Sequence, residues 1–250
     1  MVTPVPSDPD RRPVFFFDID NCLYPRSKRV QDLMQELIDA YFVRHLSLSA
    51  EEAIELHRKY YTEYGLALSG LVKHHKIDAL AYNREVDDAL PLDGLIEEDE
   101  RLQRLLGDID RRKVKLWLFT NAHVTHARRV VRLLGVERFF EGVTYCDYSK
   151  MPLLAKPHEK MFEKAEREAG VPGRSRECYF VDDSALNCRH AGQRGWTVVH
   201  KLEPEDQGPD PSAAERVIRD LEELRELFPQ FFRPGHETNG ISGAHPRSTI

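Results

Sequence analysis

The sequence predicts an α/β fold in which a doubly wound parallel sheet carries a helical insert after its first strand. Short apolar runs bounded by turn residues recur along the chain, as in strands that are buried on both faces of a parallel sheet. Amphipathic segments with helical spacing lie between these runs, and this alternation indicates helices on both faces of the sheet. One long segment is almost wholly helical in pattern, which predicts a second, smaller module.

The first predicted strand is the apolar run at residues 14–17, which Pro13 precedes and Asp18 ends. Apolar runs of similar length predict further strands at residues 115–119, 178–181 and 197–200, with a weaker candidate at 142–145.

Helices are predicted between these strands from apolar residues at spacings of three and four. The clearest cover residues 124–134 and 159–169. Gly135 and Gly170 follow them directly, in the position where glycine commonly ends a helix.

The helical insert runs from about residue 28 to residue 106. Apolar residues from Val30 to Phe42 form a stripe that predicts an amphipathic helix. Ser49 followed by Glu52 has the spacing of a capping box and predicts the start of the next helix. Because the insert leaves the sheet at the carboxyl end of a strand, it is expected to lie over the ligand crevice as a lid.

The predicted organisation is a core at 14–27 and 100–232 with a helical cap at 28–99. Residues 1–13 are rich in Pro and Asp, and residues 233–250 are polar and rich in Gly. Both terminal segments are predicted to be disordered.

Composition argues against several classes of function. The 250 residues include 42 acidic and 36 basic ones, for a net charge of −6, so nothing favours a nucleic acid polymer or an anionic membrane as partner. No apolar run is long enough for a signal peptide or a transmembrane helix, which predicts a cytoplasmic or nuclear location. The four cysteines form no Cys-x-x-Cys pair, so we expect buried, reduced thiols.

Four groups of polar residues carry the functional prediction. In chain order they are Asp18 with Asp20, Thr120 with Asn121, Lys156 before a helix, and Asp182 with Asp183. Each group alone has an ordinary structural interpretation as a turn or a helix cap. Their joint occurrence favours a site, because three of the groups follow predicted strands whose carboxyl ends converge in this fold.

The residue types indicate phosphoryl chemistry. Crowded carboxylates repel each other unless a cation intervenes, and Mg²⁺ binds carboxylates together with substrate phosphate. Lys156 adds a positive charge and Thr120 a hydroxyl donor, which suit a phosphoryl group. A carboxylate can attack phosphorus to form an aspartyl-phosphate, and Asp20 is close enough in sequence to Asp18 to protonate the leaving oxygen.

These four groups resemble, in order, the four motifs of the haloacid dehalogenase superfamily, whose core is Rossmann-like. The insert resembles the C1-type cap of that superfamily. The segments FFFDIDNCLYP, KLWLFTNA, GVTYCDYS and YFVDDSALN, together with the cap segment from YYTEYG to DDALPL, are similar to the fungal pyrimidine 5′-nucleotidases. The resemblance covers roughly residues 14–230.

The resemblance implies that Asp18 is the nucleophile and one magnesium ligand. Asp20 would protonate the leaving oxygen, accept a proton from the attacking water and give its backbone carbonyl to the metal. Lys156 would stabilise the charge on the nucleophile and phosphate. Dehalogenases lack the second carboxylate, so Asp20 argues for phosphate esters. Many superfamily members have Thr at the position of Cys22, so phosphate contacts of that side chain are not carried over.

The same resemblance implies the remaining core roles. Thr120 and Asn121 would bind the phosphate oxygens. Asp182 would ligate Mg²⁺, and Asp183 would either ligate through water or orient the site.

The cap is expected to select the substrate. Tyr60, Tyr61 and Tyr64 with Gly65 could stack on a base, and His74, His75, Asn83 and Arg84 offer hydrogen bonds. Packing in the core of the cap is the alternative interpretation of the tyrosines.

The predicted function is hydrolysis of nucleoside 5′-monophosphates, pyrimidine nucleotides preferred, with Mg²⁺ as cofactor. A phosphatase for another small ester, such as lysophosphatidate or a sugar phosphate, is the alternative within the enzyme class. A non-catalytic, receiver-like protein is the alternative outside it; receiver domains are about half this length and lack a helical lid.

Overall fold

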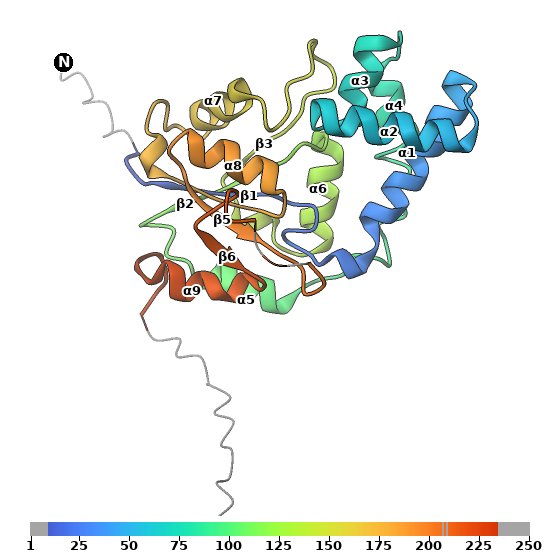
Figure 1. Ribbon diagram of the computed structural model, residues 1–250. Helices are drawn as coiled ribbons and strands as arrows, with labels where there is room; N and C mark the ends of the chain where they lie inside the picture. The colour runs from blue at the N-terminus through green and yellow to red at the C-terminus, as the bar shows by residue number, and fades with distance from the viewer. Residues whose placement is uncertain (1–9, 207, 209, 235–250) are drawn as a thin grey trace, which may run out of the picture.

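The computed structural model describes residues 10–206, 208 and 210–234, and Figure 1 shows a sheet between helices with a helical module at one end. Most of the two segments predicted to be disordered, 1–13 and 233–250, lies outside the described residues. Within the described part, Arg12 pairs with Glu141 at 2.8 Å between Nη1 and Oε1.

The sheet is parallel throughout. In the described residues its strands are β1 (Val14–Phe17), β2 (Lys115–Phe119), β3 (Gly142–Thr144), β4 (Cys178–Asp182), β5 (Thr197–Lys201) and β6 (Arg216–Ile218). Their order is β3-β2-β1-β4-β5-β6, so the chain reverses direction across the sheet at β1. All five predicted strands are present. Strand β6 was not predicted because three residues at the sheet edge make no recognisable apolar run.

Helices cover both faces of the sheet, as a doubly wound fold requires. The α-helices of the described residues are α1 (Val30–Leu46), α2 (Ala50–Tyr64), α3 (Ala67–His74), α4 (Ala79–Glu85), α5 (Glu100–Asp108), α6 (Val124–Leu133), α7 (Glu159–Glu168), α8 (Ala185–Gln193) and α9 (Leu224–Leu227). Helices α7 and α8 lie on one face, and α5, α6 and α9 lie on the other (Figure 1). The two predicted core helices correspond to α6 and α7.

Strand β1 shows why its sequence is continuously apolar. Phe15 and Phe17 pack in the cluster on the α5, α6 and α9 side, whereas Phe16 packs in the cluster under α7 and α8. Phe16 stacks on Trp196 with ring centroids 4.7 Å apart. Successive side chains of a strand point to opposite faces, so a strand covered on both sides must be apolar at every position.

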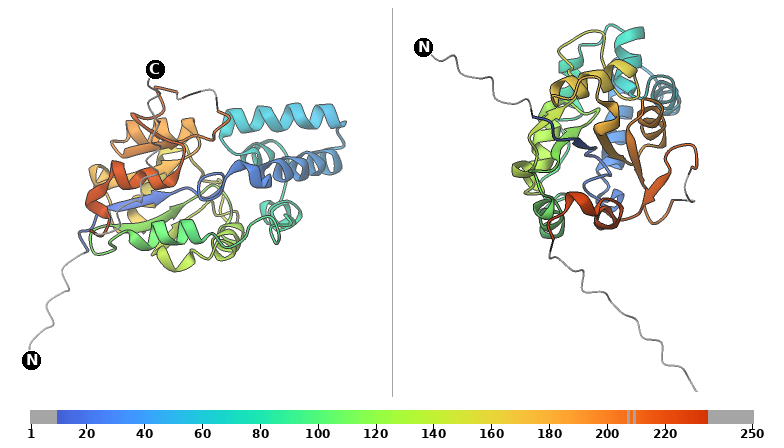
Figure 2. Two further views of the ribbon diagram at one scale, coloured as in Figure 1. Left: turned by 90° about the horizontal axis from the view of Figure 1, so that it is seen from below. Right: turned by 90° about the vertical axis from the view of Figure 1, so that its left-hand side faces the viewer.

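The insert forms α1 to α4, and α1 and α2 run side by side away from the sheet (Figure 2, left). The Ser49–Glu52 capping box opens α2 as predicted. The insert has its own apolar cluster, which includes Phe42 and Leu68 and also Tyr148 from the loop after β3. This shared cluster joins the cap to the core.

Two further sequence expectations can be compared with the structure. The four cysteines are free and buried, as predicted. Of the helices within the described residues, none has the length and apolar content needed to cross a membrane.

Glu166 ties α7 to the end of α8 and to the segments that lead into β4 and β5. Its carboxylate accepts hydrogen bonds from Arg194 (2.9 Å to each oxygen), from the indole of Trp196 (2.8 Å) and from Ser175 (2.7 Å). Burial alone would raise the pKa of Glu166, but these donors, Arg194 first, outweigh it and hold the pKa below its ordinary value. The ionised carboxylate therefore stabilises the fold.

We expect Glu166→Gln to lower the free energy of unfolding at neutral pH by about 2 kcal/mol, because a buried ion pair loses one partner. The pKa is lower in the folded state, so this contribution is present above the unfolded value of 4.5 and is lost as the pH falls through the folded value. Urea unfolding of the wild type and the variant at pH 7 and near pH 4 measures this. The difference between their free energies of unfolding should be smaller at the lower pH.

Glu159→Gln is the matched control. Glu159 lies 3.6 Å from Arg194 but is exposed, so its substitution should cost less than about 0.5 kcal/mol. Equal effects of the two substitutions would contradict the anchoring role of Glu166.

Candidate active site

The strand order brings the predicted polar groups together at one edge of the sheet. Asp18 follows β1, Thr120 follows β2 and Asp182 ends β4, and these strands are neighbours. The amide of Asp18 donates to Val181 of β4, and the amide of Thr120 donates to Thr144 of β3, both at 3.0 Å. Parallel pairing therefore places side chains that are far apart in the sequence around one point.

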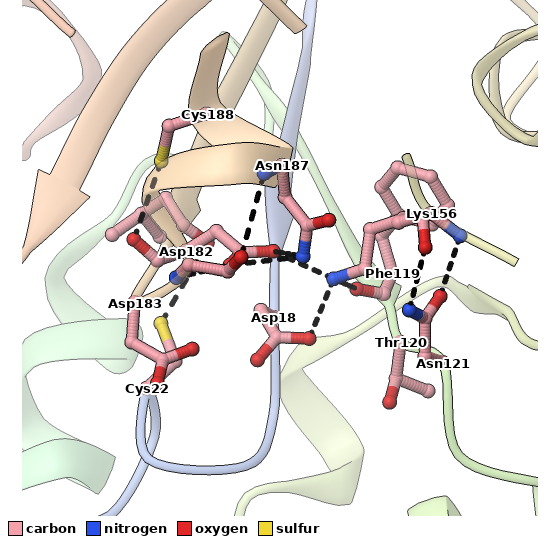
Figure 3. Close-up of polar contacts among 12 residues, drawn as sticks. Asp18, Cys22, Phe119, Thr120, Asn121, Lys156, Asp182, Asp183, Asn187 and Cys188 are labelled. Carbon is pink, nitrogen blue, oxygen red and sulfur yellow. Dashed lines mark hydrogen bonds and ion pairs between the residues drawn. The ribbon is translucent and has the colours of Figure 1, made fainter. Parts of the chain in front are cut away.

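Lys156 lies at the centre of this group (Figure 3). Its ammonium donates to Oδ1 of Asp18 at 2.7 Å, to Oδ2 of Asp182 at 2.6 Å and to the carbonyl of Phe119 at 2.8 Å. The side chain is only 1% exposed. Burial alone would lower the pKa of Lys156, but the charges of Asp18 and Asp182 outweigh burial and raise it. The lysine is therefore held as a cation.

Three carboxylates gather at this cation, and one lysine does not neutralise them. One oxygen from each of Asp18, Asp182 and Asp183 lies within 4.8 Å of the others. Burial raises the pKa of Asp18 despite the opposing charge of Lys156. Burial and the charge of Asp182 raise the pKa of Asp183 to about 7. This excess of negative charge and the all-oxygen donor set fit a hard divalent cation such as Mg²⁺.

Asp182 is oriented by the start of α8. Its Oδ1 accepts the backbone N–H of Ser184 at 2.7 Å, and the amide of Asn187 lies 3.2–3.3 Å from both of its oxygens. Asn187 was not singled out from the sequence. Its position in the first turn of a helix that follows an acidic pair is the signal that could have identified it.

Thr120 and Asn121 were predicted to bind phosphate. Thr120 lines the cavity described below, and its Oγ1 accepts the backbone N–H of Ala122 at 3.0 Å. The side-chain amide of Asn121 is occupied differently, because it donates to the carbonyl of Lys156 at 2.9 Å and accepts its N–H at 2.6 Å. In this structure Asn121 thus positions the Lys156 loop, and a phosphate contact from its side chain stays a prediction.

Asp20 lies apart from the three clustered carboxylates. Its Oδ1 accepts a hydrogen bond from the hydroxyl of Tyr24 at 2.6 Å and lies 2.8 Å from Nε2 of His126. Burial alone would raise the pKa of Asp20, but the charge and hydrogen bond of His126 outweigh it and lower the pKa. The predicted metal contact of Asp20 is through its backbone carbonyl, and it stays a prediction.

Sequence analysis missed both partners of Asp20. Tyr24 follows Asp20 by four residues, which is a weak signal in a loop. His126 is a polar residue on the buried face of amphipathic helix α6, beside Ala127 and Val130. A histidine on an otherwise apolar helix face can be recognised from the sequence pattern. Its partner Asp20 cannot, because it lies 106 residues away in the sequence.

A further buried carboxyl, Asp87, interacts with His126 from the end of the insert. Burial raises the pKa of Asp87 to about 6, with His126 opposing the shift. Among the described groups, Oδ2 of Asp87 and Nδ1 of His126 are buried without a hydrogen-bond partner. The polar surroundings of Asp20 therefore extend from the core to the insert.

A cavity of about 790 Å³ opens between the carboxyl ends of the strands and the cap. Asp18, Asp20, Thr120, Lys156 and Asp183 line its core side. The cap side is lined by α1 and α2 with Gln31, Gln35, Asp39, Ile54, His57 and Tyr61. Positions 54, 57 and 61 share one face of α2 because they are three and four residues apart. The cap thus covers the site, as expected of a lid.

Most of the predicted cap residues lie elsewhere. Tyr60 is 4% exposed and packs against Phe42, and its hydroxyl is paired with His75 at 2.8 Å. Tyr64 pairs with His74. Tyr60 lies in the interior of the cap, whereas Tyr64 and His75 are half-buried and His74 is exposed. None of these four residues lines the cavity. The interpretation of the tyrosines as core packing is therefore correct for Tyr60.

The tyrosine of this helix that does face the cavity is Tyr61, which is 55% exposed. Neighbouring helical residues point about 100° apart, so Tyr60 and Tyr61 cannot both face the core of the cap. Asn83 also lies outside the cavity lining and donates to Asp88 at 2.8 Å. The sequence prediction named Tyr60, Tyr61 and Tyr64 together, and of these three the structure places Tyr61 at the cavity.

Gly65 does line the cavity, and it allows the end of α2 to lie close to the backbone of Lys156. It ends α2 with φ +72°, and a Cβ there would lie 2.9 Å from the carbonyl oxygen of Lys156 and from Cδ of Pro157. The end of α2 therefore touches the loop that carries Lys156, and only glycine fits both the angle and the space.

Comparison with known proteins agrees with this geometry. The sequence model of the family described as haloacid dehalogenase-like hydrolase matches residues 13–189. The chain is 41% identical over 206 residues to Phosphate metabolism protein 8 of Saccharomyces cerevisiae, covering 78% of this chain and 64% of that protein. The chain therefore spans less than two thirds of that relative.

Solved structures share the fold. CbbY (mutant D10N) from Rhodobacter sphaeroides, in complex with xylulose-(1,5)bisphosphate, is 17% identical with a TM-score of 0.61, covering 85% of this chain and 96% of that one. YfnB from Bacillus subtilis, bound to magnesium, is 15% identical with a TM-score of 0.52, covering 87% and 99%.

Replacing Lys156 by Met should destabilise the metal-free protein. Asp18 and Asp182 would lose the cation that contacts both, so the free energy of unfolding at pH 7 should fall by about 3 kcal/mol. Urea unfolding in EDTA measures this. Lys160→Met, an exposed lysine of α7, is the control and should change stability by less than about 0.5 kcal/mol. Equal stability of the two variants would show that the buried pairs do not stabilise the fold.

Proposed function

The chain belongs to the haloacid dehalogenase-like hydrolases, and from this premise we propose a magnesium-dependent phosphatase of nucleoside 5′-monophosphates that prefers pyrimidine nucleotides. The observation that carries the proposal is the separate placement of two carboxylates, Asp18 and Asp20. Asp18 lies in the charged cluster with Lys156, whereas Asp20 is held separately at the same cavity. Phosphate-ester hydrolysis needs both a nucleophile and a proton donor, and these two carboxylates can supply them.

In the proposed first step, a carboxylate oxygen of Asp18 attacks phosphorus. The bond between phosphorus and the ester oxygen breaks, and that oxygen takes a proton from Asp20. In the second step, water attacks the phosphorus of the aspartyl-phosphate while Asp20 accepts its proton. The bond between Asp18 and phosphorus then breaks and inorganic phosphate leaves. Lys156 stabilises the negative charge around Asp18 throughout.

Asp18, Asp182 and Asp183 would hold the Mg²⁺ ion. When bound, the ion would neutralise carboxylate and phosphate charge so that the two anions can approach. The orienting contacts of Asp182 with Ser184 and Asn187 would keep that ligand in place.

The nucleotide preference is supported by the shape and lining of the cavity. Its volume of about 790 Å³ lies within the range typical of small-molecule sites, roughly 300–1,000 Å³. On the cap side, the exposed ring of Tyr61 offers a stacking surface, and the amides of Gln31 and Gln35 offer donors and acceptors for a base.

Purified protein with Mg²⁺ is expected to release phosphate from UMP and CMP faster than from AMP, a sugar phosphate or a lysophosphatidate. EDTA should stop release, and Asp18→Asn should lower it by at least about 10³-fold because the nucleophile is lost. The surface variant Asp93→Asn is the control and should retain full activity.

Two other outcomes have distinct meanings. Preference for another ester, still abolished in Asp18→Asn, would keep the mechanism and discard the nucleotide hypothesis. Binding of Mg²⁺ with no release from any ester would favour the receiver-like alternative.

Tyr61→Ala should raise KM for UMP by about fivefold, because one stacking contact contributes roughly 1 kcal/mol. The same variant should alter KM for p-nitrophenyl phosphate much less, since the smaller ester does not reach α2. Tyr61→Phe keeps the ring and should behave like the wild type. Steady-state kinetics on both esters provide the test, and equal effects on both would argue against contact with a base.

A further inference from the structure

We propose that His126 and Tyr24 are positioning residues that occupy Oδ1 of Asp20 and so reserve Oδ2 for proton transfer with the substrate. The inference rests on the proposed function, because it takes Asp20 as the acid and base. It adds a residue from α6 and one from the loop after β1 to the machinery.

The two contacts converge on one atom. Tyr24 Oη lies 2.6 Å and His126 Nε2 lies 2.8 Å from the same oxygen, Oδ1 of Asp20. A carboxyl oxygen has two lone pairs, so two donors satisfy it fully. Among the described residues no hydrogen bond reaches Oδ2, and the Asp20 side chain, which lines the cavity, is 34% exposed. The free oxygen is therefore the one available to a ligand.

His126 is placed to act as a donor. Its side chain is 0% exposed, and among the described groups its Nδ1 has no hydrogen-bond partner. A proton on Nε2 satisfies Asp20, whereas the tautomer protonated only on Nδ1 would set two acceptors against each other.

The arrangement directs the proton in both directions of the reaction. When Asp20 is a neutral acid, a proton on Oδ1 would displace one of the two donors, so the proton lies on Oδ2. The Oδ2–H bond breaks as the ester oxygen leaves phosphorus with its electron pair and takes that proton. In the second step the proton of the attacking water returns to Oδ2. Neither His126 nor Tyr24 changes protonation state.

The two donors also keep Asp20 out of the acidic cluster. Asp18, Asp182 and Asp183 lie within reach of one cation, and a freely rotating Asp20 carboxylate could join them. Held through Oδ1, it remains a proton carrier. Asp20 is thus assigned to acid–base work by hydrogen bonds that come from outside the cluster.

The test compares esters whose leaving groups differ in their need for a proton. Uridine leaves UMP as an alkoxide and needs one, whereas nitrophenolate is stable without it. The quantity to compare is kcat/KM, because it covers only the steps up to leaving-group release. We expect His126→Ala to lower kcat/KM for UMP by about 100-fold, the lower range for general-acid catalysis. For p-nitrophenyl phosphate the loss should stay below about fivefold.

Conservative variants separate positioning from folding. His126→Gln places an amide N–H near the position of Nε2 and should recover most of the activity on UMP. Tyr24→Phe removes only the hydroxyl and should show the same split between the two esters, with a smaller loss. Thr125→Ala changes an exposed residue of α6 and should leave both esters unaffected.

Equal losses on both esters in His126→Ala and Tyr24→Phe would overturn the inference, as would failure of His126→Gln to recover activity on UMP. If the wild type instead prefers another alkyl phosphate, that ester replaces UMP in the comparison. The nucleotide hypothesis has then failed. The role of His126 is still tested by comparing the loss of kcat/KM on that alkyl phosphate with the loss on p-nitrophenyl phosphate. Absence of phosphate release from every ester would overturn both.

Discussion

The buried ion-pair cluster around Lys156 is the interaction on which the rest of the site depends. One ammonium group contacts carboxylates at the ends of β1 and β4 and the carbonyl that ends β2. Without it, Asp18 and Asp182 would repel each other in a poorly solvated place, where charges interact strongly. The parallel sheet brings these groups together, and Lys156 makes that convergence stable.

Two aspartates that are two residues apart acquire different properties from their surroundings. Asp18 is buried against Lys156, and burial raises its pKa. Asp20 turns away toward His126 and Tyr24, which lower its pKa despite burial. In the metal-free protein these shifts favour a neutral Asp18 and an ionised Asp20, the reverse of what a nucleophile and an acid need. The support for the proposed phosphatase therefore comes from the separate placement of the two carboxylates at one cavity.

The cap contributes to the cavity through α1 and one face of α2. Helix α2 buries Tyr60 in the interior of the insert and turns Tyr61 toward the cavity. Gly65, the residue after α2, lies against the backbone of Lys156. The part of the cap that lines the cavity is thus in direct contact with the loop that carries Lys156.

Much of the fold could be predicted from the sequence, because buried strands and amphipathic helices leave local patterns of apolar residues. These patterns revealed five strands and the helical insert, and the ends of the predicted strands pointed to Asp18, Thr120 and Asp182. Lys156, which precedes a helix, was singled out as part of the same set of polar groups. Strand β6 was missed because three edge residues carry no such pattern. The tertiary structure alone decided which tyrosine of α2 meets the cavity and that His126 meets Asp20. Burial and pairing across 106 residues depend on what lies opposite a side chain, and no local pattern records that.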